Sequence, residues 1–378
     1  MQMKRVLSED MKLQNRIMVY NYIHKKPGQN VTRTELGQNT GISGPTILKI
    51  FEHLAQRNLV LDEGSLERQR PGRRSNIYRF NPNAALAVGV AFDGKTLDMS
   101  LVNLNYEIVA RKTELLETDF PNLICNILPD RLKSLSGGRS PILGAGISLP
   151  AIVNTKNRNI RYQTRPFSES EISALSLEAE CDALEKAVGY KIQLENDVNS
   201  AAVAEFRTRD YSEVGDFVYI TLGSGLGAGI ILDGKLRRGS SFACGEIGYM
   251  LTCLPKSPSV GSTGFTEREI YNYSLEHYGV DLRGSCPLPL PVGLVTHIAE
   301  VLALLIANLS NSLDISRFVL GGFVYEKIGQ PLIDELNQIL RPLFLHHLEI
   351  SGVQSESPAS KGAASLLMDE EIATLLAD

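Results

Sequence analysis

The segment KIQLENDVNSAAVAEFR, residues 191–207, decides the fold class. Residues 191–196 are expected to form a strand, which leads into a helix expected from Ser200 to Arg207. Asp197 directly follows the strand, so its side chain is able to point into a cleft beyond the strand's end. A strand that leads straight into a helix is typical of α/β proteins.

The sequence on both sides of this segment continues the alternation of strands and helices. Apolar strands are expected at 87–92, 97–103, 142–148, 217–222 and 230–232. Asp93 and Gly94 form the turn between the first two strands. The run GSGLGAG at 223–229 has glycines at alternate positions, which allows backbone amides to approach an anion closely. A plain β-hairpin explains that run nearly as well.

The composition is that of an ordinary globular protein. The chain has 378 residues, 43% of them apolar and 21% charged, and its length predicts two or three domains. We expect no membrane span, because no stretch approaches about 18 apolar residues, and no secretion, because the N-terminus is charged throughout. Five scattered cysteines without a C-x-x-C pair predict neither a disulfide framework nor a cysteine metal site in a cytoplasmic protein.

The charge is distributed unevenly along the chain. Residues 1–82 carry a net charge of +7, whereas the remainder carries −12, for a total of −5. A basic head on an acidic body indicates that the head binds a polyanion, although a basic surface is also compatible with simple solvation.

Residues 1–82 have the pattern of a winged helix-turn-helix domain. An amphipathic helix over 9–26 ends at Pro27-Gly28, and the sequence TRTE at 32–35 is a capping box for a short helix over 33–39. Ser43 is placed to cap a third helix, which presents an apolar side to the core. That side consists of Ile47, Ile50, Phe51 and Leu54.

The exposed parts of this head are the predicted DNA contacts. In helix-turn-helix units the first turn of the last helix enters the major groove. The predicted contacts around that turn are Thr32, Arg33, Ser43, Gly44, Pro45, Thr46 and Lys49. Between strands expected at 59–63 and 76–80 lies a basic wing tip with Arg68, Arg70, Arg73 and Arg74, thin enough for a minor groove. The alternative is a small helical protein-interaction domain with a basic loop.

Four motifs of the body resemble the ROK family of bacterial repressors and sugar kinases. They are ENDVNSAA at 195–202, the glycine run 222–229, GEIG at 245–248 and LGG at 320–322. The resemblance spans essentially the whole chain, and the head makes it similar to the xylose-repressor and N-acetylglucosamine-repressor branch. It implies an actin-like, ribonuclease H-like sugar-kinase fold with two lobes, 83–198 and 199–378, whose C-terminal helix is able to return to the first lobe.

The resemblance also implies a sugar site. Asn196 and Asp197 match the pair that hydrogen-bonds sugar hydroxyls, and Glu246 and Glu267 match two sugar-binding glutamates of the family. Carboxylates suit this task because each oxygen accepts hydrogen bonds from hydroxyl groups. Tyr249 replaces a histidine that helps to shape the sugar pocket in zinc-bearing members.

The phosphate-binding turns depart from the kinase pattern. In the family's D-I-G-G-T strand, the aspartate position is Ala91, the first glycine is Asp93 and the threonine is Lys95. Phosphoryl transfer depends on metal and charge placement at the γ-phosphate. We therefore expect degenerate phosphate loops at Asp93, Gly94, Gly223, Gly225 and Gly227, no ATP cofactor and no enzyme activity.

The family's zinc site is absent from the sequence. Its histidine position is Tyr249, and its three cysteine positions are Pro258, Val260 and Phe265. A structural zinc site needs about four nitrogen or sulfur ligands. We therefore expect no bound metal.

These features predict a sugar-responsive DNA-binding regulator. The preferred interpretation is a repressor of a carbohydrate-utilisation operon, which binds double-stranded operator DNA as a homodimer or dimer of dimers. A sugar or sugar phosphate in the inter-lobe cleft would release it. Two alternatives stay open: an ATP-dependent sugar kinase with a regulatory head, and a repressor controlled by a protein partner.

Overall fold

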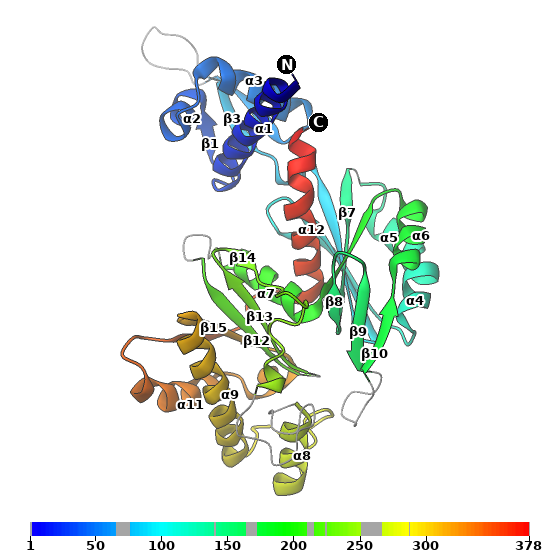
Figure 1. Cartoon of the computed structure of the whole chain (residues 1–378), viewed down its shortest axis with the longest axis vertical. Helices are drawn as coiled ribbons and strands as arrows, with labels where there is room; N and C mark the ends of the chain where they lie inside the picture. Colours follow the sequence, from blue (N-terminus) through cyan, green and yellow to red (C-terminus); the bar gives the residue numbers. More distant parts are fainter. Residues whose placement is uncertain are drawn as a thin grey trace.

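A computed structural model shows a small head domain joined to two α/β lobes (Figure 1). It describes residues 2–65, 76–139, 141–163, 172–209, 215–223, 225–250, 267–286 and 288–377. Both chain ends lie at the head, and one long helix, α12, runs from the head to the junction of the lobes (Figure 1).

The head is a winged helix-turn-helix domain, as predicted. Its elements are α1 (Gln2–His24), β1 (Asn30–Thr32), α2 (Arg33–Thr40), α3 (Gly44–Gln56), β2 (Val60–Ser65) and β3 (Asn76–Phe80). The strands form an antiparallel sheet in the order β1-β3-β2. All four apolar residues predicted on the inner side of α3 are buried. Phe51 stacks on Tyr78 of the sheet, with ring centroids 3.7 Å apart.

Lobe 1 is built on a five-stranded sheet with strand order β11-β7-β4-β5-β6, beside a small antiparallel sheet in the order β10-β9-β8. Its strands are β4 (Leu86–Phe92), β5 (Thr96–Asn103), β6 (Ile108–Leu115), β7 (Ile142–Leu149), β8 (Ile152–Asn154), β9 (Asn159–Gln163), β10 (Ile172–Ser176) and β11 (Lys191–Asn196). The single-turn η1 (Pro82–Ala84) leads in from the head, and the lobe's helices are α4 (Phe120–Asn122), the π-helical η2 (Leu123–Ile127), α5 (Leu128–Ser136) and α6 (Glu178–Val188).

Lobe 2 contains a second five-stranded sheet in the order β14-β13-β12-β15-β16. Its strands are β12 (Phe217–Leu222), β13 (Leu226–Leu232), β14 (Lys235–Leu236), β15 (Arg317–Gly321) and β16 (Glu349–Gly352). Its helices and single turns are η4 (Ile247–Tyr249), α8 (Glu267–Tyr278), α9 (Val292–Leu313), α10 (Phe323–Ile328), α11 (Gln330–Leu340) and η5 (Arg341–Leu343). The sequence led us to expect no stretch long and apolar enough to cross a membrane. Helix α9 meets that condition by length and composition, but half of its most apolar window is buried inside the protein.

Two helices lie at the junction of the lobes, α7 (Asp197–Thr208) and α12 (Pro358–Ala377), and they pack against each other. Glycines allow this close approach. A Cβ at Gly362 would lie 1.7 Å from the carbonyl oxygen of Ser200, and one at Gly89 would lie 1.7 Å from that of Ser360. Helix α12 is thus seated directly on α7 and on β4, and it covers the sheet of lobe 1 although it follows lobe 2 in sequence.

The head shares one apolar core with lobe 1 and α12. Val19, Ile23 and Phe80 of the head belong to the same buried cluster as Leu104 of lobe 1 and Leu367 of α12. Polar contacts reinforce this joint, because head side chains bind backbone oxygens of the body. His24 hydrogen-bonds the carbonyl of Leu104 at 2.8 Å, and Arg16 and His53 bind the carbonyl of Leu376 at 2.8 and 3.1 Å.

Candidate functional site

The start of helix α7 forms the centre of the site. Strand β11 ends at Asn196, whose side-chain oxygen accepts a hydrogen bond from the Asn199 amide at 2.9 Å and so caps the helix. Its amide nitrogen donates to the carbonyl oxygen of Ala151 at 3.0 Å and to Oδ1 of Asp197 at 3.1 Å. Asn196 therefore holds the helix start and the Asp197 carboxylate in place, a role beyond the predicted sugar contact.

Asp197 is the first residue of α7, and only one of its carboxylate oxygens is engaged. Oδ1 also accepts the Val198 amide at 2.9 Å, whereas Oδ2 has no hydrogen-bond partner among the described residues. Burial raises the pKa of Asp197 to about 7, and the nearby negative charges of Glu246 and Asp93 add to that rise. The site thus presents an acceptor oxygen whose charge is switchable near neutral pH.

Glu246 and Asp93 belong to the same electrostatic environment as Asp197. Glu246 is partly buried and precedes the single-turn η4 of lobe 2, and Tyr249 at the end of that turn is 37% exposed. Asp93 lies in the β4–β5 turn of lobe 1. Carboxylates from both lobes therefore lie close enough to act on Asp197, and sugar binding by Asp197 and Glu246 stays a prediction.

The remaining predicted site residues are placed with less detail. Glu267 begins helix α8. The zinc positions Pro258, Val260 and Phe265 lie outside the described residues, so the expected absence of a metal stays a prediction. Among the residues that the structure does describe, no group of three or more His, Cys, Asp or Glu side chains is arranged to hold a metal ion.

The first predicted phosphate turn is satisfied by its own aspartate. Oδ1 of Asp93 accepts the backbone amides of Lys95 and Thr96 at 2.9 and 2.7 Å. These amides are the kind of group that binds a phosphate in a kinase turn. Here they are already paired, and a carboxylate stands beside them.

The second predicted phosphate turn is shorter than expected. Strand β13 begins at Leu226, so Gly227 lies in a strand instead of a loop. A Cβ on Gly227 would lie 3.2 Å from Val198 of α7, and one on Gly229 would lie 2.4 Å from Ala202. These two glycines allow α7 to pack on the sheet of lobe 2. The turn itself contains Gly223, whose carbonyl accepts a hydrogen bond from the buried hydroxyl of Tyr271, and Gly225.

An ion pair between the lobes was not predicted from the sequence. Arg238, which follows β14, donates to Oε2 of Glu195 at 2.6 Å, and the Glu195 side chain is 2% exposed. The other oxygen of Glu195 accepts the Asn196 amide at 2.9 Å. Glu195 in a strand expected to be buried was the available signal, since a buried carboxylate requires a partner.

The described candidates for DNA contact lie at the start of α2 and in the first two turns of α3. Thr32 caps α2 by accepting the Glu35 amide at 3.2 Å, and Arg33 is the first residue of that helix. Ser43 occupies the cap position of α3 as predicted, but its hydroxyl pairs with that of Thr46 at 2.8 Å instead of with a backbone amide. Residues exposed around this helix start are Ser43, Gly44, Pro45 and Lys49.

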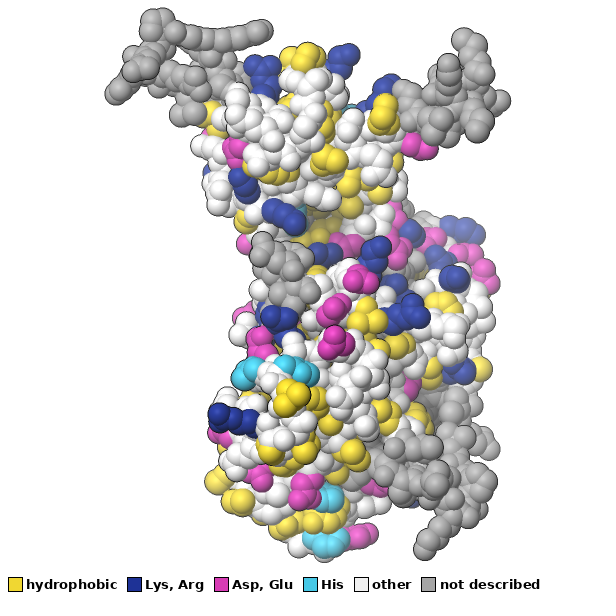
Figure 2. Space-filling model, turned by 60° about the vertical axis from the view of Figure 1, so that its left-hand side comes forward, with side chains coloured by type: hydrophobic (Ala, Val, Ile, Leu, Met, Phe, Trp, Pro, Cys, Tyr) yellow, Lys and Arg dark blue, Asp and Glu magenta, His cyan; other side chains and the backbone are white. Residues whose placement is uncertain are grey.

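The outer end of the head carries Lys and Arg side chains (Figure 2). The wing arginines Arg68, Arg70, Arg73 and Arg74 lie outside the described residues. Strands β2 and β3, which bracket them, are paired antiparallel, so the hairpin that the sequence predicted is present.

These features define a class of protein: a two-lobed actin-like sugar-kinase fold that carries a winged helix-turn-helix head. The chain belongs to the ROK family, whose profile matches residues 87–370. The structure of a "ROK family transcriptional regulator, homolog of E.coli MLC protein" covers 97% of this chain and 98% of its own, with a TM-score of 0.75 at 19% identity. A ROK family glucokinase from Streptomyces griseus aligns with 74% of this chain and 98% of its own at a TM-score of 0.54 and 21% identity.

Curated relatives include both repressors and kinases. The putative xylose repressor of Caldicellulosiruptor sp. (strain Rt8B.4) is 22% identical over 59% of this chain, and the xylose repressor of Bacillus subtilis is 21% identical over 63%. The glucokinase of Halalkalibacterium halodurans is 26% identical over 66% of this chain and 84% of its own. The matches to the two repressors span only 55% and 60% of those proteins' lengths.

Proposed function

We propose that this protein is a sugar-responsive transcriptional regulator, most simply a repressor of a carbohydrate-utilisation operon in the bacterial cytoplasm. The observation that carries the proposal is the joint between the head and lobe 1. A DNA-binding head fused into the core of a sugar-kinase fold links the cleft at Asp197 to the operator. Binding of a sugar or sugar phosphate between the lobes would favour one inter-lobe angle and thereby change operator affinity, a coupling of about 1–3 kcal/mol in typical cases.

Three features support a regulator that does not transfer phosphate. Ala91 stands at the position of the kinase aspartate, and Asp93 occupies the amides of its own turn. The ring of Phe323 packs beside the second turn, since a Cβ on Gly223 would lie 3.3 Å from it. The competing candidate is a sugar kinase with a regulatory head, which the glucokinase relatives favour.

Operator binding by a dimer follows from the geometry of helix-turn-helix proteins. Two heads related by a two-fold axis read two half-sites, which supplies both affinity and spacing specificity. The proposed partners are therefore double-stranded operator DNA and a second copy of this chain.

The decisive experiment uses the DNA that flanks the protein's own gene. Labelled fragments of this DNA are titrated with the protein, with and without a panel of sugars and ATP-Mg²⁺. Specific binding that a sugar alone weakens supports the repressor. Turnover of about 1 s⁻¹ or more in a coupled kinase assay would establish the kinase instead, and release only by a cell extract freed of small molecules would point to a protein partner.

The wing gives a second test of DNA binding. Replacing Arg73 and Arg74 with Ala is expected to weaken binding and to lower the salt slope by about one unit for each lost phosphate contact. Replacing the exposed Lys133 of α5 with Ala is the matched control. If the double variant binds with the wild-type slope and affinity, the wing makes no contact.

The proposal includes no zinc and no ATP as resident cofactors. Elemental analysis of protein purified without an affinity tag is expected to find no stoichiometric zinc. About one chelator-resistant zinc per chain would mean that the loop around 258–265 is aligned incorrectly with the family.

A further inference from the structure

A cavity of about 450 Å³ lies between the small sheet of lobe 1 and residues 240–242 of lobe 2. This volume falls within the range of small-molecule sites. In each of the two lobes, a residue that lines the cavity is close in sequence to a residue of the Asp197 site or to one that contacts it. Ile152 in its wall follows Ala151, which binds Asn196, and Phe242 in its wall precedes Glu246 by four residues.

One face of the small sheet forms the cavity wall. The strand register places Arg161 opposite Ile152 and Ala174, in one row across the three strands. The next row on the same face consists of Asn154, Asn159 and Ser176. All six of these residues line the cavity. Val153 and Ile160, which alternate with these residues along β8 and β9, belong to the core of lobe 1, and Ile160 also borders the cavity.

The polar row offers unused hydrogen-bonding groups. Among the described residues, the side chains of Asn159 and Ser176 have no hydrogen-bond partner, and Asn154 uses only its oxygen, which accepts the Lys156 amide at 3.1 Å. Amide and hydroxyl groups both donate and accept, which matches the hydroxyl groups of a sugar.

Phe242 adds an apolar surface on the side of lobe 2. Its φ is 61°, in the left-handed region that bulky residues rarely adopt. A backbone held in this conformation costs free energy and is characteristic of functional sites. Phe242 lines the cavity from the side of lobe 2, and its ring supplies an apolar surface on which the C–H face of a sugar is able to pack.

The charge of the cleft selects against an anionic ligand. Among the residues that the structure describes, Arg161 is the one cation that lines the cavity, and its guanidinium already donates to the carbonyl oxygen of Ser241 at 3.2 Å. The adjoining cleft contains the carboxylates of Asp197, Glu246 and Asp93, which repel a phosphate group. A neutral polyhydroxyl group meets no such penalty.

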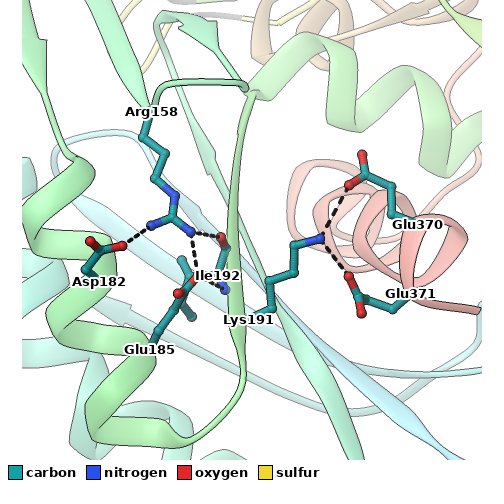
Figure 3. A network of polar contacts seen from close by, with 7 residues as sticks. All are labelled: Arg158, Asp182, Glu185, Lys191, Ile192, Glu370 and Glu371. Carbon is teal, nitrogen blue, oxygen red and sulfur yellow. Dashed lines mark hydrogen bonds and ion pairs between the residues drawn. The ribbon is translucent and has the colours of Figure 1, made fainter. Parts of the chain in front are cut away.

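An ionic network fixes the wall to lobe 1 (Figure 3). Arg158, in the β8–β9 turn, donates to Asp182 at 2.7 Å, to Glu185 at 2.5 Å and to the carbonyl oxygen of Ile192 at 3.2 Å. These contacts tie the hairpin to α6 and β11. Because the wall is held before any ligand arrives, less ordering is required on binding.

We infer that the cavity is a subsite for a second sugar ring, so that the effector is a neutral glycoside of two or more rings. This inference rests on the proposed function and specifies its ligand. The first ring binds at Asp197, and the second binds between the polar row of lobe 1 and Phe242 of lobe 2. Since the two walls belong to different lobes, the second ring also bridges them.

The test compares matched saccharides by isothermal titration calorimetry on the full chain. The probes are glucose with cellobiose, xylose with xylobiose, and glucose 6-phosphate. We expect at least one disaccharide to bind about tenfold or more tightly than its monosaccharide.

Two variants test whether the tighter binding of disaccharides comes from the cavity. Phe242→Gly removes the ring while relieving the backbone strain, and Asn159→Ala removes one member of the polar row. Each is expected to lower disaccharide affinity about five- to tenfold and to leave monosaccharide affinity within twofold. Asn126→Ala, at an exposed asparagine of η2 on the far side of lobe 1, is the matched control. Thermal unfolding of each variant verifies that it folds.

The other outcomes separate this inference from the proposed function. Equal affinity for one and two rings, unchanged in Phe242→Gly, overturns the second-ring subsite while the regulator proposal stands. Tightest binding of glucose 6-phosphate, lost in Arg161→Gln, overturns the neutral ligand in favour of an anion. Binding of none of the five probes, together with operator binding that none of them alters, counts against the saccharide-controlled regulator itself.

Discussion

Lobe 1 makes two joints that differ in their chemistry. Its joint with the head is a continuous apolar core, closed by side chains such as Arg16 that bind the last carbonyls of α12. Its joint with lobe 2 contains a cavity, several carboxylates and the Arg238–Glu195 ion pair. The first joint leaves little room for motion, whereas the second contains space and charge on which a ligand is able to act.

This difference indicates how a signal would reach DNA. The head is expected to move with lobe 1 as one body, because α12, which spans about 30 Å, is seated on lobe 1 at one end and bound by the head at the other. A change of the inter-lobe angle would then alter the position of each head relative to lobe 2. In a dimer held together through other parts of the chain, such a change would alter the spacing of the two heads.

The largest expected effect comes from disrupting the packing of α12 against α7. Gly362→Ala places a Cβ 1.7 Å from the Ser200 carbonyl oxygen, so the helices are forced apart. We expect a loss of about 3 kcal/mol or more in the free energy of unfolding and a Tm lower by about 4 °C or more. Gly284→Ala is the control, because nothing lies within 4 Å of its Cβ position. A wild-type Tm for Gly362→Ala would show that α12 is not seated on α7.

The second effect concerns the cleft alone. Asp197→Asn keeps an oxygen for the Val198 amide but removes the charge that would accept a sugar hydroxyl. A charge-assisted hydrogen bond is worth about 1.5–3 kcal/mol, so saccharide affinity is expected to fall about 10- to 150-fold while operator affinity stays unchanged. Calorimetry and DNA titration measure the two quantities, with the exposed Asp130→Asn as control. Lost operator binding with a normal saccharide response would make Asp197 a purely structural cap.

The raised pKa of Asp197 predicts a smaller effect, in which pH changes saccharide affinity and stability. Because this pKa is raised to about 7 in the folded protein, the carboxyl group is charged above pH 7 and protonated below it. Saccharide affinity is expected to fall about tenfold from pH 8 to pH 6, since the ionised fraction falls by that factor. Because the folded protein binds this proton more tightly than the unfolded chain does, Asp197 makes the free energy of unfolding without ligand larger as pH falls from 7 toward 4. Asp197→Asn is expected to remove both dependences, and an equal slope in that variant would assign them to another group.

The smallest effect comes from the head joint. Arg16→Ala removes two hydrogen bonds, to the carbonyl oxygens of Leu376 and Ala377 at 2.8 and 2.9 Å, but leaves the apolar core intact. We expect a loss of about 1 kcal/mol, seen as faster hydrogen exchange in α1 and the end of α12, with unchanged saccharide affinity. The exposed Lys12→Ala is the control on the same helix. Equal exchange in both variants would show that the core alone holds the head.

Much of the fold follows from local patterns. The apolar strands β4, β7 and β12 and the buried side of α3 were predicted because their residues are apolar at regular spacing, and the structure confirms them. Helix α7 begins three residues earlier than predicted because Asn196 caps it, a contact that hydropathy does not reveal. For the glycine run the sequence left a phosphate-binding turn and a plain β-hairpin open, and the structure has the hairpin: β12 and β13 pair antiparallel, with Gly227 and Gly229 in β13 beneath α7.

The site was predicted only in part. Asp197 and Glu246 share an electrostatic environment as the motifs implied. The cavity could not be predicted, because it depends on how three short strands pair and on the placement of lobe 2 beside them. The alternation of Asn159, Ile160, Arg161 and Tyr162 was the one local signal, since it gives the strand a polar and an apolar face.

In the proposed mechanism the head moves with lobe 1, and the ligand acts between the two lobes. Spin labels at the exposed positions Lys49 in the head, Lys133 in lobe 1 and Asn337 in lobe 2 report the two distances directly. Labelled chain is diluted with unlabelled chain, so that only distances within one protomer count. On saturation with the tightest-binding saccharide of the calorimetric panel, we predict that the 133–337 distance changes by more than about 2 Å and that the 49–133 distance does not change. A changed 49–133 distance with a constant 133–337 distance would show instead that the head moves on lobe 1 and that the lobes do not respond to the ligand.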